Sequence, residues 1–169
     1  MRVALERFWA WYERNYALNV TVAAVLFALQ LVHLVWLTFD PLWARVFDHP
    51  AFEIEKPWSW PLLLVDYTEI PALLTVSLVY VNEVRKGGRL KPIAYLLFLN
   101  SQWLHIFWIT DEFVVESGEG ATSLPAGLAY VAILIDYLEL PVIVDTFRKT
   151  AAALRERRGA RRGAGEELR

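Results

Sequence analysis

The chain contains no cysteine, and this absence excludes several kinds of metal and redox site. Iron–sulfur clusters, thiolate zinc sites and thiolate-ligated haem all require cysteine sulfur. Lysine and arginine are also absent from four long apolar runs, which cover residues 17–39, 58–81, 92–109 and 124–144. A carboxylate inside one of these runs therefore has no basic partner within the runs themselves.

Apolar residues are abundant, at 56% of the 169 residues, and eight of them are tryptophan. Each apolar run falls within the range of about 17 to 25 residues with which an α-helix crosses a bilayer. In lipid, a spanning segment must satisfy its own backbone polar groups, which favours helices. We expect an all-α integral membrane protein with four transmembrane helices.

The basic residues predict the orientation of these helices. All lysines and arginines except Arg45 and Lys56 precede the first run, separate the second from the third, or follow the fourth. The positive-inside rule then predicts a multi-pass protein of the cell membrane with both termini in the cytoplasm. Residues 1–16 mix aromatic and charged residues, as in an interfacial helix. Residues 148–169 predict a basic cytoplasmic tail that frays into solvent and suits anionic lipid, with no nucleic-acid partner.

Two sequence patterns each occur twice. Residues 30–38 and 102–110 share QxxHxxWxT, and the hexapeptides at 66–71 and 136–141 read DYTEIP and DYLELP. Such self-similarity indicates an internal repeat.

The repeat predicts two tandem helical hairpins, residues 17–81 and 92–147. Because each hairpin contains an even number of spans, both enter the membrane in the same direction, so the pseudo-twofold axis runs along the membrane normal. We expect a four-helix bundle around this axis.

The repeated ionisable residues are the candidate metal ligands, and they should converge on the axis in the outer half of the bilayer. They are His33, Asp66, Glu69, His105, Asp136 and Glu139. One ionised acid near the membrane centre costs about 2.5 to 3.5 kcal/mol, so four acids need compensation. Two divalent ions would balance four carboxylates and use both imidazoles as neutral ligands. Without thiolates, this ligand set suits iron, manganese or zinc.

Other repeated residues are expected to support this site. Candidates for hydrogen bonds to the ligands are Gln30, Gln102, Tyr67 and Tyr137, although the glutamines also suit bonds between helices and the tyrosines also suit ordinary packing. Pro71 and Pro141 leave the carbonyls of Tyr67 and Tyr137 without their helical donors, which predicts kinks near the site.

Four carboxylates and two histidines in a four-helix bundle resemble the ligand inventory of the ferritin-like di-iron or di-manganese carboxylate proteins. In that class two helices each carry a lone Glu and the other two carry ExxH. Here His33 and His105 stand alone on two helices, and DxxE pairs occupy the other two. The resemblance implies di-metal chemistry at the six positions.

The function predicted from these residues is a membrane-embedded di-metal protein, with oxidoreductase activity on oxygen or a lipid-soluble substrate such as a quinone. Three alternatives remain open: a metal or proton transporter, a b-type cytochrome with His33 and His105 as axial ligands, and a zinc-dependent lipid hydrolase. The sequence identifies no catalytic residue, electron partner or oligomeric state.

Overall fold

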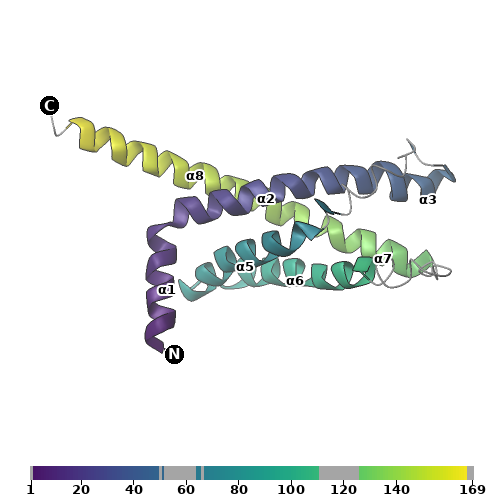
Figure 1. Ribbon diagram of the computed structural model, residues 1–169, viewed down its shortest axis with the longest axis horizontal. Helices are drawn as coiled ribbons and strands as arrows, with labels where there is room; N and C mark the ends of the chain where they lie inside the picture. Colours follow the sequence, from purple (N-terminus) through teal and green to yellow (C-terminus); the bar gives the residue numbers. More distant parts are fainter. Residues whose placement is uncertain (1, 50, 52–63, 66, 111–125, 167–169) are drawn as a thin grey trace.

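The computed structural model of the chain describes residues 2–49, 51, 64–65, 67–110 and 126–166 (Figure 1). Within this part the regular elements are all helical, which confirms the predicted all-α fold. The elements are α1 (Arg2–Arg14), α2 (Tyr16–Leu37), the π-helical turn η1 (Thr38–Leu42), α3 (Trp43–Phe47), α5 (Glu69–Arg85), α6 (Leu90–Thr110), α7 (Ala126–Tyr137) and α8 (Glu139–Glu166).

Four rods of helix pack around one core. Helix α2 contacts α5 and α8, while α6 contacts α5, α7 and α8. Because α7 leads directly into α8 after one residue, the two helices together form the fourth rod (Figure 1). Each rod contributes fully or nearly fully buried apolar side chains to the core, among them Phe27, Val76, Leu99 and Ile143.

Two of the rods are interrupted at the positions that the repeated prolines predict. Between α7 and α8, the Leu138 N–H turns back to the carbonyl of Ile135, at 3.0 Å. Before α5, the Thr68 N–H is shared between the carbonyls of Leu64 and Val65, at 3.2 and 3.0 Å. Both interruptions lie three residues before a proline that cannot donate a backbone hydrogen bond. They therefore occur at equivalent places in the two DYxExP segments.

Helix α1 runs almost at right angles to α2 and lies at the end of the bundle where α5 meets α6 (Figure 1). Its buried side chains, Trp9 and Tyr12, face the bundle. The guanidinium of Arg85, at the end of α5, lies 4.0 Å from the Trp9 ring centroid. Glu13 adds ion pairs of 3.9 Å to Arg85 and 3.5 Å to Lys86. These contacts hold α1 across the end of the bundle.

Of the helices in the described part of the chain, only α2 is long and apolar enough to cross a membrane. The structure does not support the prediction of four transmembrane helices, because the other described helices are too short or too polar. Helix α5 begins at Glu69 and has only 17 residues, and α7 has only 12. Helix α8 begins with Glu139 and continues into a basic sequence, and α6 carries Lys91 and several uncharged polar residues.

The prediction that residues 148–169 fray into solvent is wrong for most of that segment. Helix α8 continues without interruption to Glu166. The segment has only one glycine, Gly159, before Gly163, and its alanines and arginines are strong helix formers, which explains the continuation.

Candidate metal centre

Two histidines and one aspartate, all repeat positions, meet inside the bundle. His33 comes from the last part of α2, His105 from α6 and Asp136 from the end of α7. One ligand atom from each residue lies within 4.8 Å of the others, and all three side chains are buried. The two imidazole ring centroids are 5.9 Å apart, with the ring planes at 71°. The helices therefore bring together residues that are far apart in the sequence.

Each oxygen of Asp136 faces a different histidine. His105 Nδ1 lies 3.2 Å from Oδ1, and His33 Nε2 lies 3.7 Å from Oδ2. A charge-assisted N–H···O hydrogen bond is shorter, at about 2.7 to 2.9 Å. Ligand atoms about 2.1 Å from a shared ion in tetrahedral geometry are instead about 3.4 Å apart. The observed separations bracket that value, so the arrangement fits ligands spaced around a cation.

Two glutamates bury their carboxyl groups in the same half of the bundle. Glu69 is 4% exposed and Glu139 is 3% exposed. Glu139 interacts electrostatically with Asp136 and His33, which places its carboxyl group beside the histidine–aspartate group. Within the described part of the chain, Glu139 Oε1 receives no hydrogen bond. A buried carboxylate oxygen without a donor needs a proton or a cation.

Asp66, the remaining predicted carboxylate ligand, lies outside the described residues. The structure therefore brings together His33, His105 and Asp136 and places Glu139 next to them. Glu69 is buried in the same half of the bundle.

The repeated glutamines bind the interrupted segments near the site. Gln102 Nε2 donates to the carbonyl of Ile135 at 2.8 Å. Gln30 Nε2 donates to Thr68 Oγ1 at 3.2 Å and lies 3.5 Å from the carbonyl of Val65. Ile135 and Val65 each precede a repeated aspartate. Both glutamines are at most 1% exposed, and they secure the ligand-bearing segments from a neighbouring helix.

The two repeated tyrosines are half-buried. The Tyr137 hydroxyl shares a hydrogen bond of 2.6 Å with Thr38 Oγ1, which joins the second hairpin to the end of α2. Whether Tyr67 and Tyr137 also hydrogen-bond the candidate ligands stays a prediction. This contact closes the bundle beside His33.

Comparisons with known proteins leave the site to be interpreted from its own chemistry. No family model, curated protein or solved structure matches the chain.

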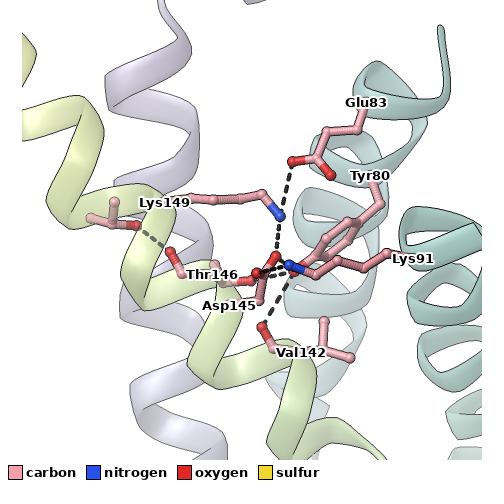
Figure 2. A network of polar contacts seen from close by, with 8 residues as sticks. Tyr80, Glu83, Lys91, Val142, Asp145, Thr146 and Lys149 are labelled. Atoms are coloured by element: carbon pink, nitrogen blue, oxygen red, sulfur yellow. Dashed lines mark hydrogen bonds and ion pairs between the residues drawn. The ribbon is translucent and has the colours of Figure 1, made fainter. Parts of the chain in front are cut away.

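A second polar cluster, which the sequence interpretation missed, lies where α5 ends and α6 begins (Figure 2). The Tyr80 hydroxyl donates to Asp145 Oδ2 at 3.0 Å, and the Asp145 carboxylate also accepts hydrogen bonds from Lys91 and Lys149. Lys149 also pairs with Glu83 at 2.8 Å. We call these five residues the Asp145 network. It joins α5, α6 and α8.

The pKa values of two members of this network follow from these contacts. Burial acts to raise the pKa of Asp145, but hydrogen bonds from Lys149 and Lys91 outweigh burial and lower it. The hydrogen bond to Asp145 raises the pKa of Lys91. Both residues therefore remain charged at neutral pH. The signal in the sequence was the spacing of four residues between Asp145 and Lys149, which is typical of a helical ion pair.

Proposed function

We propose that this chain is a membrane-embedded metal-binding protein in which His33, His105 and Asp136 hold a divalent iron, manganese or zinc ion. The observation that carries the proposal is the convergence of three buried ligand atoms within 4.8 Å from three helices. Imidazole and carboxylate are ligands that all three metals accept. The bonds from Gln30 and Gln102 would hold the ligand-bearing segments in place, as outer hydrogen bonds do in metal sites.

The surface of the bundle supports a location in the membrane. Along α2 the exposed side chains form an apolar stripe of Leu18, Val22, Val25, Leu29, Val32 and Val35. Other large apolar side chains, such as Leu97 and Leu134, are more than 60% exposed on α6 and α7. Apolar surface this extensive marks contact with a membrane or a partner. Since the polar residues of the candidate metal centre are inside, lipid is the partner that we propose.

We propose a second ion beside the first, with Glu69, Glu139 and Asp66 completing its ligands. The charges support this stoichiometry, because two divalent cations neutralise four carboxylates. Glu139 Oε1, which receives no hydrogen bond from the described residues, supports it too. Chemistry like that of the ferritin-like di-iron and di-manganese proteins would follow from such a ligand set.

The activity that we propose is oxidation or reduction of a lipid-soluble substrate such as a quinone, or of oxygen. A redox-active ion inside a bundle whose outer surface is apolar suits such a substrate. The position of Asp136 favours an ion over a haem, because a porphyrin between the two imidazoles would displace the carboxylate that contacts both. The Asp145 network disfavours transport, because its acids are held by lysines and offer no open path.

The test is elemental analysis of the full chain, purified in detergent without chelators. We expect about two equivalents of iron, manganese or zinc per chain, bound in the geometry of a bridged pair. His33→Ala and His105→Ala should each reduce the content of that metal, while His49→Ala, at an exposed position, should leave it unchanged. Wild-type protein that carries no metal after growth with each of the three would disprove the proposal.

The redox activity has a separate test. Metal-loaded protein in vesicles should consume oxygen when a reduced quinone is added, and His33→Ala should not. A metal-loaded wild-type protein that fails to oxidise quinols or other lipid-soluble reductants would leave the metal site standing and remove the oxidoreductase assignment.

A further inference from the structure

A groove between α6 and α8, lined by none of the candidate metal ligands, combines positive charge with apolar walls. The cavity has a volume of about 310 Å³ and is lined by Lys91 and Tyr95 from α6 and by Leu140, Val144, Asp145 and Arg148 from α8. A volume of this size is at the lower end for small-ligand sites, about 300 Å³. It can hold a headgroup but not a whole lipid.

The charges around the groove favour an anion with a single negative charge. In the Asp145 network, two lysines balance Asp145 and Glu83, so the network is neutral. Arg148 is exposed and forms no ion pair with the described residues, so one positive charge is uncompensated at the groove. A phosphodiester carries one negative charge, and arginine binds phosphate oxygens with two parallel hydrogen bonds.

The apolar side of the groove indicates what is attached to the phosphate. Leu140 and Val144 are 39% and 47% exposed, and both precede Arg148 on α8, toward the middle of the bundle. Lys91 stands in the first turn of α6, so both cations lie toward the end of the bundle where α6 begins. A cationic end followed by an apolar wall matches the order of headgroup and acyl chain in a lipid. A free phosphate would use only the cationic end.

We propose that this groove binds an anionic phospholipid, with its phosphate at Arg148 and Lys91 and the start of an acyl chain along Leu140 and Val144. The proposal depends on the membrane location given under the proposed function. Lys91 lies in the first turn of α6, and α6 begins at the end of the bundle where both termini lie (Figure 1), so the lipid would come from the cytoplasmic leaflet.

The experiment compares lipids retained by the full chain after reconstitution into nanodiscs of phosphatidylcholine with a minor fraction of phosphatidylglycerol. Native mass spectrometry of the released protein counts the bound lipids. We expect wild-type protein to retain phosphatidylglycerol preferentially, and Arg148→Gln to retain it about tenfold less, since the charge-assisted contact of the guanidinium with the phosphate is lost. Arg155→Gln removes the same charge from an exposed position of α8 outside the groove and should behave as wild type.

A second variant tests the apolar wall without changing any charge. Val144→Trp fills the groove and should also reduce phosphatidylglycerol retention, while the Asp145 network stays intact. Equal retention by wild type and Arg148→Gln would overturn the proposal, as would equal retention of phosphatidylcholine. Displacement of the lipid by millimolar inorganic phosphate would reassign the groove to free phosphate.

The same sample separates this inference from the proposed function. Metal content measured on the Arg148→Gln protein should equal that of wild type, because Arg148 is not a candidate ligand. Protein that stays soluble without detergent or lipid would overturn both the membrane location and the lipid site, whatever its metal content. Membrane-inserted, metal-loaded protein without bound phosphatidylglycerol would overturn the lipid site alone.

Discussion

Asp136 is the residue on which the candidate metal centre depends most, because its two oxygens face the two histidines separately. Asp136→Asn keeps the size of the side chain but removes its charge and turns one oxygen into an amide. We expect metal affinity to fall by at least about tenfold, since even outer partners of metal ligands contribute that much. Competition with a chelator measures the change, and Asp48→Asn, at an exposed position, is the matched control.

A salt bridge or hydrogen-bonded triad would give the opposite result. If Asp136 only accepted hydrogen bonds from the two histidines, Asp136→Asn would alter stability and leave the metal content at its wild-type value. That outcome would remove the metal assignment even though the geometry is unchanged.

Asp145 gives a prediction about pH. Its pKa is lowered in the folded chain, so its contribution to stability is complete above the unfolded value of about 3.9 and is lost as the pH falls through the folded value. At pH 7, Asp145→Asn should lower the free energy of unfolding by about 2 kcal/mol, because hydrogen bonds to charged groups are lost. The difference from wild type should vanish in acid. Denaturant titrations in detergent at several pH values measure it.

The control for this prediction is an exposed acid. Glu6 pairs with Arg2 at 3.9 Å on the surface of α1, and Glu6→Gln should change the free energy of unfolding by less than about 0.5 kcal/mol. A difference between wild type and Asp145→Asn that persists well below the folded pKa would show that the carboxylate charge is not the cause.

The candidate ligands could be predicted from the sequence because they occur in the repeated patterns. His33 and His105 occupy equivalent positions, and Asp136 was found through its counterpart in the other hexapeptide, so the histidine–aspartate group follows from pattern alone. The Asp145 network could not be found this way. The first hairpin has Thr75 and Val79 at the positions equivalent to Asp145 and Lys149, and so carries no matching signal.

At the scale of the elements, the break between α7 and α8 separates Asp136 from Glu139. Pro141→Ala restores a backbone donor to the carbonyl of Tyr137 and should let the two helices join into one. The rotation of Asp136 relative to Glu139 should reduce metal affinity by about tenfold to a hundredfold, as for other changes in the support of a metal site. Isothermal titration of the metal-free protein measures this affinity.

Pro92 supplies the control for the helix break. It stands in the first turn of α6, where a backbone N–H has no helical acceptor, so Pro92→Ala should leave metal affinity unchanged. Equal affinities for Pro141→Ala and wild type would show that the break does not position the ligands.

The elements themselves were predictable in kind but not in length. Apolar runs indicated helices, and the prolines indicated the breaks at Thr68 and Leu138. The end of α8 differs from the prediction, because glycine and charge in the tail indicate fraying whereas the helix continues to Glu166. The helix propensity of Ala and Arg outweighs the unfavourable propensity of Gly159. No close packing requires a glycine at this position, because an added Cβ would meet nothing within 4 Å.

For the whole molecule, the bundle has polar side chains in its interior and an apolar surface. Glutamine, histidine and carboxylate side chains are buried within it, while its surface exposes leucine, valine and phenylalanine. The basic turn between α5 and α6 lies at the same end as both termini, and α3 lies at the opposite end (Figure 1). If the membrane plane is perpendicular to the long axis of the bundle, the end with the basic turn and both termini would lie in the cytoplasm.

The absence of cysteine makes this orientation directly testable, because one introduced cysteine is the only thiol in the chain. Arg89→Cys, in the turn between α5 and α6, and His49→Cys, after α3, are both at exposed positions at opposite ends of the bundle. In intact cells an impermeant thiol reagent should label His49→Cys and leave Arg89→Cys unlabelled until the membrane is opened. The reversed pattern would place the metal centre in the inner half of the bilayer and the Asp145 network outside. Labelling of both variants in intact cells would contradict any arrangement in which α2 crosses the membrane between them.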